Sequence, residues 1–411
     1  MLSDLVRHHV RDAQGHTARL GDLAVDLGAA EYPVVMRLLV PGDGGAPRAL
    51  PCPATLDPAQ GLVVEALDAA MPLDADALAA LVLLRRDVQD ALLLDLAQER
   101  AVRANDLVLA QRGAGLALVG ADVSATAVLR RLSHGLLRTH GPGSLLDWRE
   151  VEFLRGTPGA VAAGRAYHRR VTRLHPSQIA RLADAVPYLH AAELLALLAD
   201  PLAADVLESM LPERQVQVIA ELTPPQATGI LAEMAPDAAA DLLGRLAIAD
   251  AAHLLETLPP ERALPIQDLL RFPPDTAGGI MTNAMVYAPV DRTVGDVIAY
   301  IRDELAHPDF VYFVYLVDDP ATRRLCGVVT LRELLLADHA TPIEQVMTAD
   351  LQVVGPLEPA DAVARRIADY GLNALPVVAA DGSLLGIVTV DAAMVQILPV
   401  AWRDRLPRVF S

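Results

Sequence analysis

A twelve-residue repeat runs without interruption from residue 175 to residue 270. The eighth position of every block is aliphatic, the twelfth is Val, Leu or Met, and proline stands near the start of most blocks. Positions 5, 8, 9 and 12 share one face of an α-helix, and proline is tolerated in a first helical turn. Each block therefore predicts a helix of about two turns followed by a corner. Because so short a helix is unstable alone, the repeat predicts an all-α superhelix of stacked helices with a shared core.

The repeat is also acidic. It contains fourteen acidic residues against four arginines, so more than half of the formal net charge of −18 lies in this segment. Such a chain lacks the basic face that binds nucleic acid, and cations are its expected partners. Asp237 and Asp241 stand four residues apart and project from one helix face, where a divalent cation would relieve their repulsion. The alternative for such a pair is an ordinary solvated helix face.

Several classes of protein are disfavoured by the remaining composition. No uninterrupted apolar stretch of about 18 residues is present, so we expect no membrane span. The N-terminus has neither the cationic start nor the apolar core of a signal peptide. The two cysteines, Cys52 and Cys326, lie in unrelated contexts and predict no disulfide framework. We therefore expect a soluble, cytoplasmic protein of several domains.

The first 134 residues read as short strands and turns in a course that occurs twice. Residues 5–10 alternate as a strand would, and residues 12–15 form a turn. The pattern resembles the PRC-barrel domain, a small β-barrel, present at 1–68 and 69–134, with RAND at 103–106 in the better copy. Such barrels mostly serve docking or assembly. A basic linker, 135–174, follows and is expected to be solvated or to dock on the acidic repeat, with Trp148 and Phe153 anchoring it to the second barrel.

After the repeat, the segment FPPDTAGGIMT at 272–282 predicts a capped junction. Asp275 or Thr276 can cap the helix that follows, and Gly278-Gly279 allows this helix to pack closely. A strand-and-helix pattern then occurs twice, opening at Met281 and at Met347, with GVVT at 327–330 equivalent to GIVT at 386–389. The expected helices are 294–305, 331–337 and 360–370, and the expected strands are 310–317, 325–330, 374–378 and 384–389.

This doubled pattern resembles a tandem pair of CBS domains, at 272–342 and 343–411. The resemblance implies adenine-nucleotide (ATP) binding through the motif G-x-x-[ST]-x-x-[DE]. The first copy keeps the motif, which makes Thr330, Arg332 and Glu333 the candidate nucleotide contacts. In the second copy, Ala392 stands three residues after Thr389, where the motif has an acid. The alternative is that the threonine merely caps the next helix. CBS pairs usually dimerise, so the resemblance also implies a homodimer through 294–305 and 360–370.

The order of acidic superhelix, D-x-A-G-G-x-M-T junction and CBS pair resembles the cytoplasmic half of the MgtE family of magnesium channels, over about residues 173–398. In that family, magnesium ions bridge carboxylates of the superhelix and of the CBS pair. Matched by position, the resemblance implies Mg²⁺ ligands at Asp205, Asp237, Asp241 and Asp361.

The sequence also departs from the MgtE pattern. Gly371 stands where the family often has an aspartate. Ala392 and Val395 replace aspartates after the second V-T-V-D, and Asp391 is the remaining candidate ligand there. We therefore expect fewer or weaker magnesium sites than in the channels.

The fold expected from these patterns is multidomain α+β, with a β-barrel-like N-terminal region, an all-α superhelix of short helices and a tandem α/β CBS pair. No H-E-x-x-H, Walker-type glycine loop or G-x-S-x-G predicts an enzyme. Because no membrane span occurs up to Ser411, the expected function is Mg²⁺ sensing by a non-enzymatic protein that regulates a magnesium or divalent-metal transporter in trans. The alternatives are an adenine-nucleotide-binding CBS module and a PRC-barrel scaffold that holds a membrane partner and binds no ligand.

Overall fold

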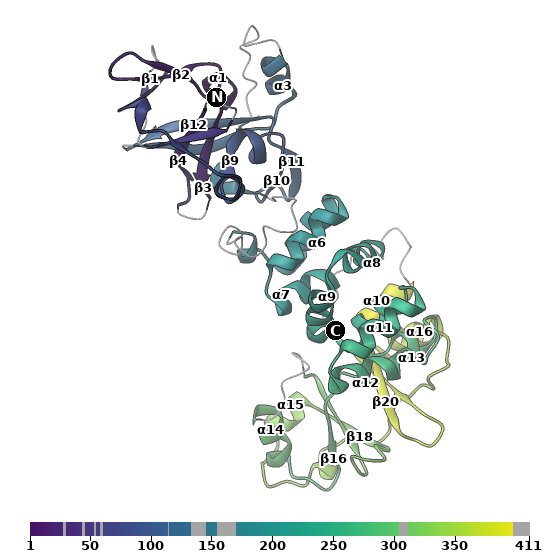
Figure 1. The fold of residues 1–411 in the computed structure, drawn as a ribbon. Coiled ribbons are helices and arrows are strands. Elements are labelled where there is room, and N and C mark those ends of the chain that lie inside the picture. The colour runs from purple at the N-terminus through teal and green to yellow at the C-terminus, as the bar shows by residue number, and fades with distance from the viewer. Residues whose placement is uncertain are drawn as a thin grey trace. The chain divides into compact units, whose positions relative to one another are not determined.

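The computed structural model describes residues 1–27, 30–42, 46–52, 55–57, 61–113, 115–132, 145–153, 170–303 and 311–397 (Figure 1). Two compact units, Met1–Leu198 and Ala199–Ser411, divide the chain. The predicted fold class is confirmed, because a sheet-rich region is followed by short helices and then by a strand-and-helix pair. Most of the predicted linker, and the segment 398–411, lie outside the described residues.

The first unit is built on three sheets. One has the order β2-β1-β7-β6 and contains β1 (His9–Asp12), β2 (Thr17–Arg19), β6 (Thr55–Asp57) and β7 (Gly61–Val64). A second has the order β11-β10-β15 and contains β10 (Leu92–Asp95), β11 (Arg100–Arg103) and β15 (Val151–Phe153). The largest has the order β12-β13-β4-β3-β9, with three further strands pairing alongside; its strands are β3 (Asp22–Asp26), β4 (Val34–Pro41), β5 (Pro47–Pro51), β8 (Met71–Pro72), β9 (Val82–Leu83), β12 (Asp106–Arg112), β13 (Gly115–Asp122) and β14 (Leu145–Asp147).

None of these sheets closes into a barrel among the described strands. The unit is therefore strand-rich as predicted, but its resemblance to the PRC-barrel domain stays a prediction. The short helices beside the sheets are α1 (Leu2–Leu5), α2 (Ala75–Ala79) and α3 (Ala125–Leu132). One hydrophobic core extends from Leu2 to Phe153 and includes Trp148, so both predicted anchors of the linker, Trp148 and Phe153, are buried.

The two predicted copies in this unit hold each other by reciprocal hydrogen bonds. The Asp22 carboxylate accepts from the backbone N–H groups of Arg85 and Arg86, at 2.8 and 3.0 Å, in a π-helical turn of the second copy. In return, the Asp106 carboxylate accepts from the backbone N–H of Ser3, at 3.1 Å, in α1 of the first copy. Each predicted copy thus satisfies helical N–H groups of the other, and the duplication itself stays a prediction.

The prediction of a strand at residues 5–10 is wrong. Residues Leu2–Leu5 form α1, and the first strand begins only at His9. The Asp106 carboxylate accepts from the N–H of Ser3 in the first turn of α1, and local alternation gives no sign of a partner 103 residues away. The turn predicted next is confirmed, since Gly15 has φ +89° and donates its N–H to the carbonyl of Asp12 at 3.1 Å.

The repeat forms the eight short helices that its period predicts. They are α5 (Pro176–Ala185) and α6 (Tyr188–Leu197) in the first unit, and α7 (Asp200–Glu208), α8 (Pro212–Glu221), α9 (Pro224–Glu233), α10 (Pro236–Leu243), α11 (Ile248–Thr257) and α12 (Pro260–Leu269) in the second. Every helix begins at the second residue of its block, and the eighth-position side chains are all buried. Within the second unit, α7 packs on α9, α8 on α10, α9 on α11 and α10 on α12.

The junction attaches the end of the repeat to the CBS-like pair. The Thr276 hydroxyl accepts from the N–H of Gly279 and caps α13 (Ala277–Ile280), as predicted. A Cβ atom at Gly279 would lie 2.0 Å from the carbonyl oxygen of Pro273, so only glycine fits there. The N–H groups of Ala277 and Gly278 donate to carbonyls at 358 and 356, at 2.8 Å, which ties the junction to the second copy.

In the CBS-like pair, the opening of each copy joins the other copy. The elements are β16 (Tyr287–Pro289), α14 (Val294–Asp303), β17 (Phe313–Val317), β18 (Leu325–Thr330), α15 (Leu331–Leu336), α16 (Ala360–Tyr370), β19 (Ala374–Val378), β20 (Leu384–Thr389) and α17 (Val390–Ile397), close to prediction. Thr282 pairs with Ile387 of β20, and Thr348 pairs with Val328 of β18. A Cβ atom at Gly386 would lie 2.6 Å from the carbonyl oxygen of Thr282, so this exchange requires glycine.

Candidate functional site

A cavity of about 220 Å³ lies where the repeat meets the CBS-like pair, within the second unit. Its walls come from α10, from residues 279–282 of the junction, and from the end of β20 with the first turns of α17. Three of the predicted metal ligands line it together, namely Asp237, Asp241 and Asp391. We refer to it as the acidic cavity.

A direct hydrogen bond crosses from the CBS-like pair to the repeat at this cavity. The Thr282 hydroxyl donates to Oδ1 of Asp237 at 3.0 Å. Thr282 is buried, and its backbone is paired with Ile387 of β20 in both directions at 2.9 Å. The position of Asp237 is therefore coupled to the position of the second CBS-like copy.

Asp391 presents an unsatisfied acceptor beside these groups. Its Oδ1 atom is buried and has no hydrogen-bond partner among the described residues. Burial of an acceptor without a partner is unfavourable, and native proteins rarely tolerate it without a water, an ion or another partner. Carboxylate and hydroxyl oxygens are also the ligands that hard divalent cations prefer, so the lining fits such an ion.

The acidic cavity is also lined by a cationic side chain, Arg245. One guanidinium nitrogen, Nη2, lies 3.8 Å from Oδ2 of Asp241, and the other, Nη1, donates to Oε1 of Gln215 at 3.3 Å. Arg245 is the sole cationic residue in the described lining.

The other predicted ligands lie outside the acidic cavity. Asp205 is exposed on α7, and Asp361 forms an ion pair with Arg365 at 2.5 Å on α16. As the side chains stand, no group of three or more His, Cys, Asp or Glu in the described residues is arranged to hold a metal ion. The carboxylates of the acidic cavity thus share a space without forming a compact ligand set, and the metal role of all five aspartates stays a prediction.

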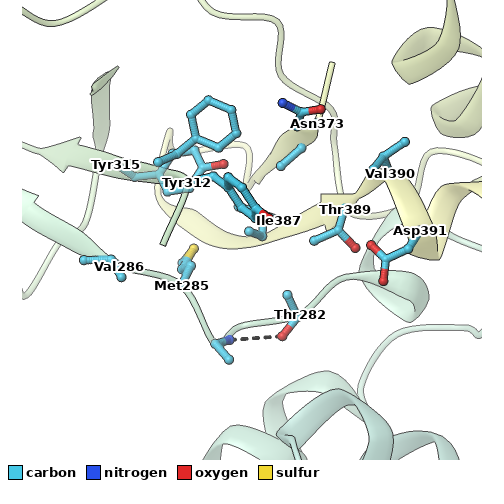
Figure 2. A pocket seen from close by; sticks show the side chains of 13 residues that line it. Thr282, Met285, Val286, Tyr312, Tyr315, Asn373, Ile387, Thr389, Val390 and Asp391 are labelled. Carbon is cyan, nitrogen blue, oxygen red and sulfur yellow. Dashed lines mark hydrogen bonds between the residues drawn. The ribbon is translucent and has the colours of Figure 1, made fainter. Parts of the chain in front are cut away.

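A second cavity, of about 240 Å³, lies inside the CBS-like pair (Figure 2). Figure 2 shows Thr389 and Asp391 next to each other at one end of it, with Tyr312 and Tyr315 toward the other. Most of its wall is apolar, and Asn373 adds a polar group. Its residues Thr282, Thr389 and Asp391 also line the acidic cavity. We refer to it as the CBS cavity.

The predicted nucleotide contacts of the first copy lie elsewhere. Thr330 and Glu333 form a capping box at the start of α15, in which the Glu333 N–H donates to the Thr330 hydroxyl oxygen at 3.1 Å and the Thr330 N–H donates to the Glu333 carboxylate at 2.8 Å. Arg332 is exposed, and none of the three lines the CBS cavity. The structure therefore gives Thr330 the capping role that the sequence left as the alternative, and nucleotide binding there stays a prediction.

The residues of the CBS cavity were not found by motif reasoning. Thr389 occupies the motif position in the second copy, but the acid nearest to it, Asp391, follows after two residues instead of three. Part of the remaining wall, residues 282 and 284–286, comes from the opening of the first copy, which reaches this place because Thr282 pairs with Ile387. The equivalence of GVVT at 327–330 and GIVT at 386–389 is the sequence feature that could have indicated Thr389.

Comparison with known proteins agrees with this architecture. The family model of the MgtE intracellular N domain matches residues 174–275, and that of the CBS domain matches 277–340 and 343–397. The crystal structure of the cytosolic domain of the Mg²⁺ channel MgtE in complex with ATP is 33% identical, with a TM-score of 0.53, over 58% of this chain and 98% of that chain. The chain belongs to the MgtE family. Neither matched model describes a catalytic domain.

Two MgtE relatives show how far the likeness extends. The magnesium transporter MgtE of Thermus thermophilus is 36% identical over 230 residues, which are 55% of this chain and 51% of the relative. The magnesium transporter MgtE of Enterococcus faecalis is 36% identical over 131 residues, which are 32% of this chain and 28% of the relative. The chain thus spans about half the length of the Thermus relative. Among the residues that the structure describes, no helix is long and apolar enough to span a membrane.

The departures from the MgtE pattern fall in two different environments. Ala392 and Val395, which replace expected aspartates, both line the acidic cavity beside Asp391. Gly371 instead ends α16 with φ +62°, a left-handed cap that glycine adopts most easily. Alanine and valine thus stand in the acidic cavity at positions where the resemblance implies carboxylates, whereas Gly371 has a role in the backbone.

Proposed function

We propose that this chain is a non-enzymatic, cytoplasmic regulatory protein that senses Mg²⁺ through its acidic repeat and CBS pair, and that it regulates a magnesium or divalent-metal transporter in trans. The observation that carries the proposal is the buried Oδ1 of Asp391, which has no hydrogen-bond partner among the described residues and lies in the same cavity as Asp237 and Asp241. The names of the Thermus and Enterococcus relatives, both magnesium transporters, support the choice of ion and of partner.

The chemistry of the acidic cavity suits a weakly held magnesium ion. Mg²⁺ prefers carboxylate oxygens and usually keeps several of its waters, and a cavity of about 220 Å³ has room for them. An ion there would satisfy Asp391 of α17 and neutralise Asp237 and Asp241 of α10. It would therefore favour the arrangement in which repeat and CBS pair face each other, provided that this arrangement binds the ion more tightly than any other.

The experiment is a magnesium titration of the full chain, in which calorimetry measures binding and thermal unfolding measures the melting temperature. The variant Asp237→Asn, Asp241→Asn, Asp391→Asn keeps the shapes and the Thr282 hydrogen bond but removes three charges from the acidic cavity. The matched control, Asp250→Asn with Glu256→Gln, removes two exposed carboxylates of the same repeat that lie outside it and are not predicted ligands. We expect magnesium to raise the melting temperature of the wild type and of the control but not of the triple variant. Absence of any magnesium response in the wild type would refute the proposal.

We also propose that the chain acts as a homodimer through α14 and α16. Both helices expose an aromatic side chain, Tyr300 at 38% and Tyr370 at 61%. Replacing both tyrosines by arginine should shift the sedimentation coefficient from dimer to monomer. The same change at Tyr188, which is 42% exposed on α6, should not.

An adenine-nucleotide sensor is the second candidate function, and the CBS cavity favours it. Exposed Tyr312 offers a ring on which a base can stack, and Asp391 offers a carboxylate for ribose hydroxyls. The related MgtE cytosolic domain was crystallised with ATP. Binding of ATP should be lost in Thr389→Ala and retained in Thr330→Ala, which loses a helix cap and about 1 kcal/mol of stability. The reverse pattern would place the nucleotide at Thr330, Arg332 and Glu333. If the chain binds neither magnesium nor ATP, the scaffold that binds no ligand remains as the candidate function.

A further inference from the structure

Arg245 already places a positive charge in the acidic cavity. We propose that this guanidinium is a built-in competitor of the divalent cation and sets the concentration at which the cavity binds it. The inference rests on the proposed magnesium function, because it concerns the same cavity. Its starting point is the geometry of Arg245, which reaches Asp241 on one side and Gln215 on the other.

Gln215 holds the guanidinium in place. This side chain is 8% exposed, and its Nε2 donates to the carbonyls of Leu207, Glu208 and Met210 at 2.8, 3.3 and 3.2 Å. With Nε2 committed to the end of α7, the amide presents its Oε1 to Arg245. The orientation of the amide is thus fixed by three backbone groups, and the amide in turn positions Nη1 of the arginine.

The contact on the other side is looser. Nη2 lies 3.8 Å from Oδ2 of Asp241, beyond the 2.7–2.9 Å that is typical of a charged hydrogen bond. The two side chains are 37% and 32% exposed, and such exposed pairs contribute little to stability. Asp241 can therefore exchange the guanidinium for another cation with little loss, while Arg245 stays attached to Gln215.

The charge of Arg245 determines which cations gain from that exchange. A monovalent ion that replaces the guanidinium at Asp241 brings the same single charge and gains little. A divalent ion brings twice the charge to Asp237, Asp241 and Asp391, and this compensates for its repulsion by the arginine. The arrangement therefore raises the concentration of divalent ion needed for binding and discriminates against monovalent ions.

The test compares magnesium affinity by calorimetry in the full chain at fixed ionic strength. Arg245→Gln removes the competing charge, and Arg245→Lys retains it. Arg271→Gln is the matched control, because Arg271 pairs with Asp268 at 3.2 Å at the end of the same acidic repeat and does not line the acidic cavity. We expect the dissociation constant for magnesium to fall about three- to tenfold in Arg245→Gln, and to stay near the wild-type value in the other two variants. Sodium should compete more strongly with magnesium in Arg245→Gln than in the wild type.

Each other outcome counts against the inference in a recognisable way. If the wild type binds magnesium and Arg245→Gln binds it with the same affinity, Arg245 is not a competitor of the ion. The proposed magnesium function is then unaffected. Weaker binding would mean that Arg245 positions Asp241 for the ion, which also overturns it. An equal gain in magnesium affinity in Arg271→Gln would mean that the gain comes from the change in net charge and not from Arg245 in the acidic cavity. No magnesium binding in any variant overturns the proposed function, and the inference with it.

Discussion

Asp391 holds its Oδ1 atom in a buried position with no hydrogen-bond partner among the described residues. Because an unsatisfied buried acceptor is unfavourable, Asp391→Ala should stabilise the metal-free protein by about 1 kcal/mol. The same change should abolish the rise in melting temperature that magnesium produces. Denaturant unfolding, with a chelator and then with magnesium, measures both effects. A variant less stable than the wild type in the chelator would show that Asp391 has a stabilising role without metal.

At the residue scale, the sequence indicated which aspartates to consider, but not their surroundings. Asp237 and Asp241 were recognisable by their helical spacing, and the structure adds Asp391 to the same cavity. Arg245 follows Asp241 by four residues, yet its role depends on Gln215, which lies in another helix. Gly371 was read only as a missing aspartate, because a left-handed helix cap is a backbone property that the residue type alone does not reveal.

At the scale of elements, a charged turn attaches the first helix of the repeat to the sheets of the first unit. Glu99, between β10 and β11, accepts from Nε of Arg181 at 2.6 Å and from Nε2 of Gln178 at 2.8 Å, both on α5. The Arg181 guanidinium first, and then the Gln178 amide, hold the pKa of the Glu99 carboxyl below its ordinary value of 4.5. The charged form is therefore the one that stabilises the contact.

From this follows a prediction about pH. Because the folded pKa is the lower one, the contribution of Glu99 is complete above pH 4.5 and is lost as the pH falls through the folded value. Glu99→Gln should lower the melting temperature at pH 7, and the difference from the wild type should shrink below pH 4.5. Glu150→Gln, another carboxylate of the first unit, serves as the control. A difference that is independent of pH would contradict the charged contact.

The elements themselves could be predicted wherever their signals are local. The helix starts of the repeat and the bounds of β18, α16, β19 and β20 agree with the sequence, because period, proline and glycine act within a few residues. At residues 5–10 the prediction was wrong, and there the N–H of Ser3 in α1 donates to Asp106, which is 103 residues away. The alternation of apolar and polar residues within a short segment gives no information about so distant a partner.

At the scale of the whole molecule, the positions of the cavities follow from an exchange between the CBS copies. Thr282 of the first copy pairs with Ile387 of the second, and Thr282 also donates to Asp237 of the repeat. This one segment therefore brings together the acidic cavity and the CBS cavity. The motif that predicts a nucleotide at Thr330 considers each copy by itself, whereas the CBS cavity has residues of both copies in its wall.

The acidic cavity also predicts how magnesium sensing can be strengthened. Ala392 and Val395 line it at positions where the resemblance to MgtE implies carboxylates. Since the affinity of an all-oxygen site rises with the number of charged ligands, Ala392→Asp should lower the dissociation constant for magnesium by about tenfold. It should also lower the melting temperature without metal, because four carboxylates would then repel one another there. Both effects are measured by calorimetry and thermal unfolding of the full chain.

The control for this variant is Met394→Asp, which adds the same charge to α17 on a side chain that is 44% exposed and does not line the acidic cavity. If magnesium affinity rises equally in both variants, the gain comes from net charge and not from the cavity. If it rises in neither, Asp237, Asp241 and Asp391 do not bind the ion. A gain confined to Ala392→Asp would mean that magnesium binding is limited by the number of carboxylates in the acidic cavity, and that alanine at 392 keeps the response of this chain at a higher magnesium concentration.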